Sequence, residues 1–463
     1  MNVMHLLKTL IAFTFVASFI IGAIFMIRSA DDDEIRQRLK SQILENQIKK
    51  LKEEKKETTE VEQVHERGSL PKPNERLSDP DAPISHKPED VNSLQEPSRP
   101  PSVHIFYYPW YGNPEFDHGK YYHWDHPLLL RTKPKKSFEQ TRHKPPPDVA
   151  SVFYPQLAAY SSRDSSVIDR HFKWISSAGI DVVAVSWYPK GKADDNGYPW
   201  EDLMPQLLNV SSQYKLKLAF HLEPYDKRTA LSVRDDIEYI VNTYGNHSAF
   251  YKTKPKNGDK LTPVVYIYDS YRVLNDDWAK IALPGGENTI RGTKFDTLLI
   301  GLVLKLSDVK GVKAAGFDGI YTYFAADGFT EAASMTNWQK LSQICTENDL
   351  LFVPSIGPGY DDSRVRPWNG VNTRTRDGGK YYVEHFEAAH TAKPDIVSIT
   401  SFNEWHEGTQ IEPAISFTDK TNNYTYLEYE KGSEMYLQLT NEMIRKYFVP
   451  HHQNIPMDIA KIV

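Results

Sequence analysis

From Val103 onward, short apolar or β-branched runs alternate with amphipathic helical patterns, and this alternation limits the fold more than any other feature. The helical patterns at residues 166–178 and 233–244 are each followed by a glycine, the residue that commonly caps a helix end. Eight strands alternating with helices over roughly 350 residues is the count for a (β/α)8 barrel. We therefore predict an α/β fold with a single (β/α)8 barrel; an open α/β sheet is the alternative. The predicted strands begin at Val103, Ile180, Leu216, Val264, Leu298, Gly319, Leu351 and Ile396.

Polar and aromatic residues follow almost every predicted strand. In a (β/α)8 barrel the active site lies at the carboxyl ends of the strands, in the βα loops. The chain is also rich in aromatic residues, with 27 Tyr and 9 Trp, which suits sugar stacking as well as core packing. The pattern predicts an active site at this end of the barrel, with a binding face without catalysis as the alternative. The segments are residues 107–111, 186–189, 221–225, 268–271, 321–324, 355–360 and 403–407.

Two carboxylates, Glu404 and Glu407, lie three residues apart where the last predicted strand ends. Pairs of Asp or Glu that flank a glycosidic bond do the chemistry in most sugar hydrolases, so we predict this pair to be catalytic. One carboxyl should have a raised pKa and act as the acid, while the other stays ionised. Retention needs carboxyls about 5–5.5 Å apart and inversion about 6.5–9.5 Å, and the sequence spacing allows both. Trp405 and His406 lie between the two acids, and we predict that Glu412 is structural or solvated.

Further strand-end residues are predicted to bind sugar. His221 and Glu223 are two residues apart, so they would share one face of a strand and could bind sugar hydroxyls or form a buried ion pair. Arg366 could reach sugar oxygens or pair with Asp361 or Asp362. No ligand spacing supports a metal site, and no metal or cofactor is predicted. The aromatic residues that could stack on sugar rings, or equally pack at the barrel rim, are Trp110, Tyr111, Trp187 and Tyr188.

The composition excludes several classes of protein. A net charge of −6 gives no reason to expect a nucleic-acid partner. The single cysteine, Cys345, excludes an intrachain disulfide, a cysteine zinc cluster and an iron–sulfur site, and its helical context predicts a buried thiol. The sequence has no Gly-rich phosphate motif, no Gly-x-Ser-x-Gly elbow and no dinucleotide fingerprint.

The N-terminal region predicts membrane anchoring. Residues 9–27 are uncharged and mostly apolar, long enough to cross a bilayer as a helix. N-glycosylation sequons at Asn209, Asn246 and Asn423 favour translocation of the rest of the chain. The charged first part of the following stem has an apolar stripe that could form a weak dimer, and its Pro/Ser/Glu-rich second part is an extended spacer. The predicted parts of this single-pass type II protein are a cytoplasmic tail (1–8), a signal-anchor transmembrane helix (9–27), a stem (28–101), the lumenal catalytic barrel (102–450) and a C-terminal tail (451–463).

Several of these segments together resemble the Golgi endo-α-1,2-mannosidases of glycoside hydrolase family 99. The likeness covers about residues 102–450 and is carried by long motifs. They are FYYPWYGN at 106–113, YSSRD at 160–164, SWYP at 186–189, FHLEPY at 220–225, GFDGIYTYF at 316–324, GPGY at 357–360 and SFNEWHEGTQIE at 401–412.

The resemblance implies a barrel enzyme of the Golgi membrane that cuts an α-1,2-mannosyl bond inside glucosylated high-mannose N-glycans. It would release Glc1–3Man with net retention and without a required metal. Glu404 would act as a base on the 2-hydroxyl of the mannose being cleaved, which closes a 1,2-anhydro sugar intermediate. Glu407 would be the general acid and then the base that activates water. The motif residues that match the substrate cleft are Trp187, Tyr188, His221, Tyr321, Tyr323 and Arg366, with Asn403 and Trp405 beside the acids.

Two other functions remain as alternatives. One is a lumenal lectin-like protein that keeps the cleft without turnover, and the other is a glycosidase for another α-mannoside. Turnover of a glucosylated high-mannose glycan separates both from the leading prediction.

Overall fold

The computed structural model describes residues 100–130 and 141–449. The predicted anchor at 9–27, most of the predicted stem with its possible dimer contact, and the predicted tail at 451–463 lie outside these residues. Within the two described ranges, no helix combines the length and the apolar character needed to cross a bilayer.

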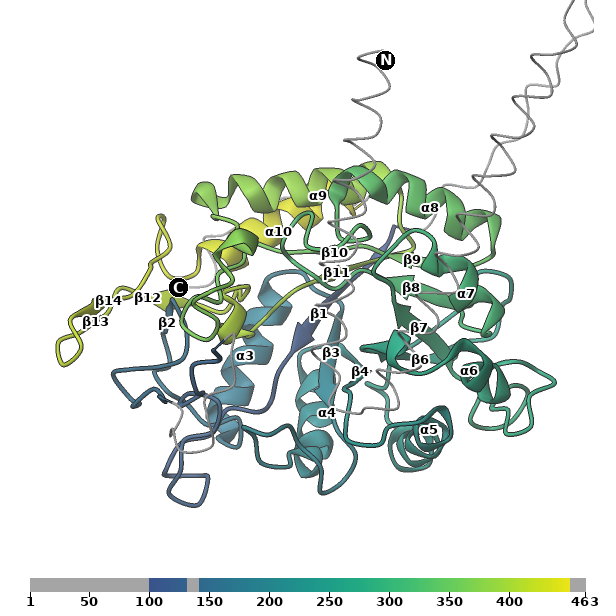
Figure 1. The fold of residues 1–463 in the computed structure, drawn as a ribbon, viewed down its shortest axis with the longest axis horizontal. Coiled ribbons are helices and arrows are strands. Elements are labelled where there is room, and N and C mark those ends of the chain that lie inside the picture. Colours follow the sequence, from purple (N-terminus) through teal and green to yellow (C-terminus); the bar gives the residue numbers. More distant parts are fainter. Residues whose placement is uncertain (1–99, 131–140, 450–463) are drawn as a thin grey trace, which may run out of the picture. The chain divides into compact units, whose positions relative to one another are not determined.

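Parallel strands form a nearly closed ring, which confirms the barrel prediction (Figure 1). β1 (Ser102–Tyr107) pairs with β3 (Val182–Trp187) on one side and with β11 (Ile396–Ile399) on the other. These runs are apolar and β-branched because both faces of each strand are covered. From β3 the ring continues in chain order through β4 (Lys217–Leu222), β6 (Thr262–Ile267), β7 (Leu298–Leu302), β8 (Gly319–Tyr321) and β9 (Leu351–Val353).

The ring closes through a strand that is interrupted at Pro354. Proline has no N–H for the ladder, so β9 ends there and β10 (Ser355–Ile356) follows, paired with β11. The Pro354 carbonyl oxygen still accepts the N–H of Ser398 at 3.0 Å, and the N–H of Asp395 donates to the Phe352 carbonyl oxygen at 3.2 Å. These bonds join the interrupted strand to β11.

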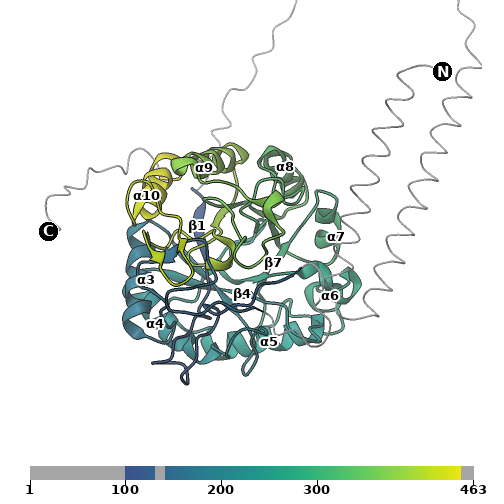
Figure 2. The same cartoon turned by 60° about the vertical axis from the view of Figure 1, so that its left-hand side comes forward.

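Helices surround the ring in chain order, as Figure 2 shows. In the first of them, α3 (Ser165–Ser177), Asp164 caps the start by accepting the N–H of Ser166 at 2.8 Å. Cys345 lies buried in α8 (Trp338–Glu347), and burial raises the pKa of its thiol to about 12, so the thiol stays protonated as predicted for a structural cysteine. The other helices are α4 (Met204–Gln213), α5 (Ala230–Tyr244), α6 (Asn275–Ala282), α7 (Asp308–Ala314), α8 (Trp338–Glu347), α9 (Lys380–Ala392) and α10 (Met435–Tyr447).

The two glycines that follow the predicted helices are required for different structural reasons. Gly179, after α3, has a φ of 79°, as expected for a left-handed cap. Gly245, after α5, has a φ of −60° and is therefore not a left-handed cap. A Cβ at Gly245 would lie 2.4 Å from the carbonyl oxygen of Val241, so close approach to the helix requires the glycine.

The inside of the ring is filled with polar and aromatic side chains. The Tyr266 hydroxyl lies 2.7 Å from His104 Nδ1, and the hydroxyls of Ser355 and Ser398 are 2.8 Å apart. Burial lowers the pKa of His104 to about 3, so this imidazole is neutral. The barrel axis is thus a hydrogen-bonded core rather than an open pore.

Short antiparallel pairs that the sequence did not predict join the loops. β2 (Tyr154–Pro155), in the long connection after β1, pairs with β12 (Ala414–Ile415), which follows β11. The pairing brings the connections after the first and last barrel strands together. The other pairs are β5 (Lys252–Thr253) with β6, and β13 (Thr418–Asp419) with β14 (Tyr424–Thr425).

Candidate active site

Glu404 and Glu407 lie on one 3-10 turn, η6 (Trp405–Glu407), in the loop after β11. Glu404 begins the turn because its Oε1 accepts the backbone N–H of His406 at 3.0 Å. Gly408 ends the turn with a φ of 60°, and a Cβ there would lie 2.7 Å from the carbonyl oxygen of Asp361. The local sequence therefore places two carboxyl groups at the carboxyl end of a barrel strand.

Asn403 ties this turn to the end of β1. Its Oδ1 accepts the N–H of Tyr108 at 2.8 Å, and its Nδ2 donates to the Tyr108 carbonyl oxygen at 2.9 Å. The Tyr111 hydroxyl donates to the Asn403 carbonyl oxygen at 3.0 Å and accepts the N–H of Trp405 at 3.1 Å. The sequence predicts Asn403, Tyr111 and Trp405 to contact substrate. All three are buried, and their hydrogen bonds hold the turn in place.

Glu412 is buried behind the same turn, which makes it structural rather than solvated. Its Oε2 accepts the Trp405 indole N–H at 3.0 Å and the Tyr160 hydroxyl at 2.8 Å. Its Oε1 lies 3.2 Å from Nε2 of His171, and both side chains are 0% exposed. A buried carboxylate is tolerated only with such partners, so Glu412 fixes the indole that lies between the two acids.

The acid pair lies in surroundings that disfavour negative charge. Burial and the charge of Glu407 raise the pKa of Glu404 well above its usual range. Burial, with Asp362 and Glu223 nearby, raises the pKa of Glu407 to about 7, against the opposing effect of Arg366. The pair therefore keeps a proton near neutral pH, and the two groups titrate together. Burial still opposes a charge on Glu404, but Arg366 and the backbone N–H of His406 favour its ionised form, and a proton on Glu407 removes the repulsion between the two groups. The pair can therefore supply one acid and one base.

Arg366 approaches the pair from the segment that follows β10. Its Nη1 donates to Asp362 Oδ2 at 3.1 Å, which confirms one of the two predicted pairings, and the Tyr360 hydroxyl donates to the same oxygen at 2.9 Å. The backbone N–H of Asp361 donates to the Glu407 carbonyl oxygen at 2.8 Å, which ties the segment to the acid turn. The Arg366 side chain is 33% exposed, so it is partly accessible from solvent.

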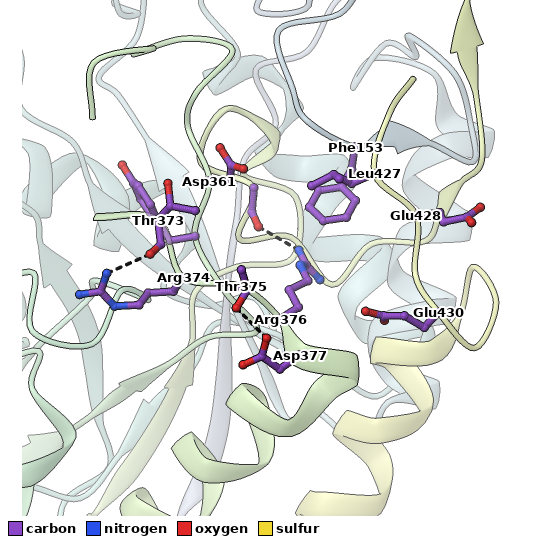
Figure 3. A pocket seen from close by; sticks show the side chains of 12 residues that line it. Phe153, Asp361, Thr373, Arg374, Thr375, Arg376, Asp377, Leu427, Glu428 and Glu430 are labelled. Atoms are coloured by element: carbon purple, nitrogen blue, oxygen red, sulfur yellow. Dashed lines mark hydrogen bonds between the residues drawn. The ribbon is translucent and has the colours of Figure 1, made fainter. Parts of the chain in front are cut away.

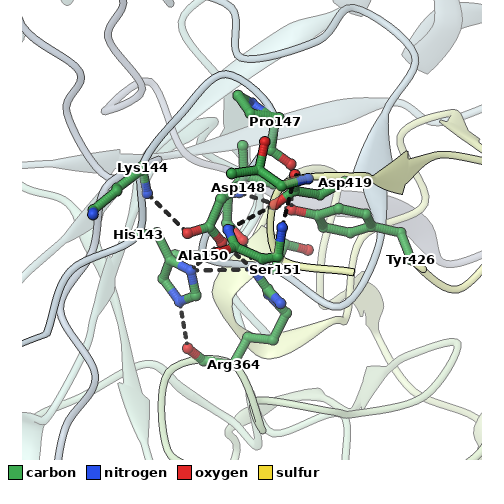
Figure 4. Close-up of polar contacts among 12 residues, drawn as sticks. His143, Lys144, Pro147, Asp148, Ala150, Ser151, Arg364, Asp419 and Tyr426 are labelled. Carbon is green, nitrogen blue, oxygen red and sulfur yellow. Dashed lines mark hydrogen bonds and ion pairs between the residues drawn. The ribbon is translucent and has the colours of Figure 1, made fainter. Parts of the chain in front are cut away.

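The same segment is anchored on another side to residues 143–151 (Figure 4). Arg364 forms an ion pair with Asp148, whose Oδ1 lies 2.7 Å from Nδ1 of His143. The other nitrogen of this imidazole, Nε2, lies 2.8 Å from the Arg364 carbonyl oxygen. The loops after β1 and β10 therefore hold each other in place.

Side chains from β4 and β8 meet at the same end of the barrel. His221 Nδ1 lies 3.2 Å from Glu223 Oε1, and its Nε2 lies 2.9 Å from the Tyr321 hydroxyl. The Tyr323 ring stacks on His221 with ring centroids 5.8 Å apart. The structure thus brings together these four predicted residues, with His221 and Glu223 in the predicted ion-pair geometry.

Tyr108 is a site residue that the sequence reasoning missed. Its hydroxyl is hydrogen-bonded to that of Tyr323, and burial together with the charges of Glu223 and Glu404 raises its pKa. Tyr108 therefore lies within electrostatic reach of the acid pair. Its position directly after β1, in the strand-end segment 107–111, was the available signal.

The predicted stacking residues differ in their access to solvent. Trp187 is 1% exposed and packs against Phe220 with ring centroids 6.0 Å apart, so it belongs to the core, and Tyr188 is also buried. Trp110 is partly exposed and stacks on His123 at a centroid distance of 4.3 Å. Trp110 therefore combines a stacked, fixed orientation with access to a ligand.

His406 points away from the acid pair. Its Nδ1 lies 3.0 Å from the Ala150 carbonyl oxygen and its Nε2 3.2 Å from Nδ1 of His123. Burial lowers the pKa of His406 well below its usual range, so the ring is neutral. In the part of the chain that the structure describes, no group of three or more His, Cys, Asp or Glu side chains is placed to hold a metal ion.

Comparison with known proteins assigns the family. The sequence profile of glycosyl hydrolase family 99 matches residues 100–449. The chain belongs to glycoside hydrolase family 99. It is 46% identical over 361 residues to a glycoprotein endo-alpha-1,2-mannosidase of Rattus norvegicus, covering 77% of each chain. It is 46% identical over 369 residues to a glycoprotein endo-alpha-1,2-mannosidase-like protein of Homo sapiens, covering 79% of each.

A solved family 99 structure shares the fold. The endo-alpha-mannosidase of Bacteroides thetaiotaomicron is 41% identical and superposes with a TM-score of 0.68, over 75% of this chain and 98% of that chain. Membership of family 99 makes this chain a glycosidase.

The three sequon asparagines of this family 99 chain are exposed. Asn209 lies on α4, Asn246 follows α5, and Asn423 lies in the turn between β13 and β14. Their positions leave all three open to modification.

The Glu412 network predicts a large effect of a small change. Glu412→Gln keeps the shape but removes the charge that His171, Tyr160 and Trp405 share. Hydrogen bonds to a buried charged group contribute about 1.5–3 kcal/mol, so we expect about 2 kcal/mol of destabilisation. Denaturant unfolding measures this, with the exposed Glu434→Gln expected to stay within about 0.5 kcal/mol of the parent. Equal stability of both variants would contradict the assignment of Glu412.

Proposed function

We propose that this protein is an endo-acting, retaining α-1,2-mannosidase that releases Glc1–3Man from glucosylated high-mannose N-glycans. In this reaction ionised Glu404 takes the proton of the 2-hydroxyl of the mannose being cleaved. That oxygen attacks the anomeric carbon and closes a 1,2-anhydro sugar, while Glu407 protonates the departing glycosidic oxygen. Water then attacks the anomeric carbon and gives a proton to Glu407, while the anhydro ring opens and Glu404 returns its proton to the 2-oxygen.

The observation that carries the proposal is the pair of buried carboxyl groups, Glu404 and Glu407, on the turn after β11 with Arg366 close by. A pKa near 7 lets Glu407 give up a proton and take one back at the pH of the secretory pathway. Arg366 and the N–H of His406 stabilise the charge that Glu404 needs. The names of the family 99 relatives in rat and human point to an α-1,2-mannosyl bond as the bond that is cut.

Several other residues have supporting roles in this proposal. Trp110 stacks on a sugar ring, and Arg366 binds sugar oxygens on the side of Glu407. Tyr323 and Tyr108 present hydroxyls to the mannose, with His221 and Glu223 holding them from below. Tyr321, Trp187, Tyr188, Asn403, Trp405 and Tyr111 shape and support this surface.

The remaining layout is proposed as the sequence predicted it. An anchor at 9–27 and a stem to residue 101 would hold the barrel in the Golgi lumen, with residues 1–8 in the cytoplasm. N-glycans on Asn209, Asn246 and Asn423 would support exposure to the lumen. Enzymatic removal of these glycans would then lower the mass of the protein. The stem could hold two copies together weakly.

Product analysis tests the proposal. The purified full chain, incubated with a monoglucosylated high-mannose glycan, should release a glucosyl-mannose disaccharide detectable by mass spectrometry. Tight binding without product would favour the lectin-like alternative. Release from an unglucosylated glycan alone would favour a glycosidase for another α-mannoside.

The pH profile should report the state of Glu407. Because the acid must be protonated, kcat/KM should fall as the pH rises through about 7. Arg366→Met removes a cation that lowers this pKa, so the fall should move to higher pH although the rate itself drops. The check is kcat/KM measured for both proteins between about pH 5 and 9. An unshifted midpoint in the variant would contradict the charge coupling.

A further inference from the structure

A cavity of about 250 Å³ lies next to the acid turn, with Tyr360 of the strand-end segment 355–360 in its wall. It is lined by Phe153, residues 360–361 and 373–377, Gly408, and residues 427, 428 and 430, and Figure 3 shows these residues around Arg376. Gly408, directly after Glu407, is part of its wall. Asp361, on the same wall, donates its N–H to the Glu407 carbonyl oxygen at 2.8 Å. The cavity and the acid turn therefore share a wall.

Arg376 makes this wall rigid. Its Nη2 donates to the carbonyl oxygens of Gly408 at 2.9 Å and Gln410 at 2.7 Å. The guanidinium lies 4.5 Å from the ring centroids of both Phe153 and Tyr436, and the side chain is only 9% exposed. Its Nε and Nη1 have no hydrogen-bond acceptor among residues 100–130 and 141–449. A buried guanidinium with unmatched donors beside a cavity fits a ligand that carries oxygen atoms.

The lining favours a neutral, hydroxyl-rich ligand over an anion. Four carboxylates against two guanidinium groups give it an excess of negative charge, which repels phosphate and other anions. Threonine hydroxyls and carboxylates suit hydrogen bonding to sugar hydroxyls, and two aromatic side chains, Phe153 and Tyr360, and one leucine offer apolar surface to a sugar ring. The lining residues that favour a neutral, hydroxyl-rich ligand are Thr373, Thr375, Asp377, Leu427, Glu428 and Glu430.

We propose that the cavity binds a sugar residue on the leaving-group side of the cleaved bond. The inference rests on the proposed function, in which Glu407 protonates the departing oxygen, so the leaving sugar must lie beside Glu407. An endo-acting enzyme holds the chain on both sides of the bond. Sugars beyond the first leaving residue then continue past Gly408 into the cavity, which makes it a determinant of preference for long glycans.

The double variant Glu428→Ala/Glu430→Ala tests this on the full chain. Both side chains are exposed, so the fold should be unaffected. We expect kcat/KM for a monoglucosylated high-mannose glycan to fall about tenfold, equivalent to about 1.4 kcal/mol. With glucosyl-mannosyl-methylumbelliferone, which has no sugar beyond the cleaved bond, kcat/KM should stay unchanged. Glu434→Ala/Glu442→Ala changes two exposed glutamates, one directly before α10 and one within it, and should change neither value.

Two results would overturn the inference. One is an equal fall in kcat/KM of the double variant for both substrates. The other is an unchanged kcat/KM of the double variant for the monoglucosylated high-mannose glycan. Failure of the parent protein to cleave either substrate would overturn the proposed function itself, and this inference with it.

Discussion

Glu407→Gln is expected to reduce cleavage of a glucosylated high-mannose glycan by about 10²–10⁴-fold, the usual contribution of general acid–base catalysis. The amide cannot protonate the departing oxygen or accept a proton from water. Folding should be preserved, because the raised pKa shows that the charged form of Glu407 is costly in the folded protein and the variant removes that charge. Steady-state kinetics and thermal unfolding of parent and variant measure both effects.

The leaving group separates an acid role from a loss of structure. A glucosyl-mannosyl fluoride needs no protonation to depart, so fluoride release by Glu407→Gln should be much less impaired than cleavage of the glycan. Glu434→Gln, an exposed carboxylate on the same domain, should retain full activity on both substrates. Equal losses for fluoride and glycan would remove Glu407 from the acid role.

Glu404→Gln should reduce turnover of the glycan to a similar degree, about 10²–10⁴-fold. Unlike Glu407→Gln, it should reduce turnover of the glucosyl-mannosyl fluoride just as much. The reason is that Glu404 acts on the attacking 2-hydroxyl rather than on the leaving group. The same steady-state assay with glycan and fluoride substrates shows whether the two variants separate in this way. If Glu404→Gln cleaved the glucosyl-mannosyl fluoride much better than the glycan, the roles of the two acids would have to be exchanged.

A substrate that lacks the 2-hydroxyl distinguishes the proposed route from a carboxylate nucleophile. In the more common retaining mechanism the carboxylate itself attacks the anomeric carbon, and the 2-hydroxyl is not required as nucleophile. The 2-deoxy-mannosyl fluoride should therefore be inert with the parent enzyme. Formation of a covalent adduct at Glu404, seen as an increase in protein mass, would contradict the anhydro route.

Much of the barrel could be predicted because its signals are local. Each strand is a short apolar run with its own turn residues, and the order of strands follows from the right-handed βαβ connection. The position of Glu404 and Glu407 could be predicted for the same reason, since the strand before them is strongly apolar and the loop begins abruptly. The break at Pro354 also agrees with what proline does to a ladder.

The buried residues that support the site depend on contacts between segments far apart in the sequence, and local sequence patterns do not encode such contacts. Trp187 is the last residue of an apolar strand and Trp110 follows one closely, yet the Trp187 ring is buried in the core and the Trp110 ring is partly exposed. Which way each ring turns depends on its partners in the fold, Phe220 for Trp187 and His123 for Trp110. Glu412 and Arg376 are likewise defined by partners such as His171 and Phe153, more than 200 residues away.

Time-resolved proton NMR of the reaction tests the central claim most directly. The parent protein with a monoglucosylated high-mannose glycan should first yield a glucosyl-mannose disaccharide whose reducing mannose is the α anomer, with the β anomer appearing later by mutarotation. That single spectrum reports both the endo cleavage and the retention that Glu404 and Glu407 are proposed to achieve together. Initial formation of the β anomer, or release of free glucose or free mannose instead of the disaccharide, would contradict the account.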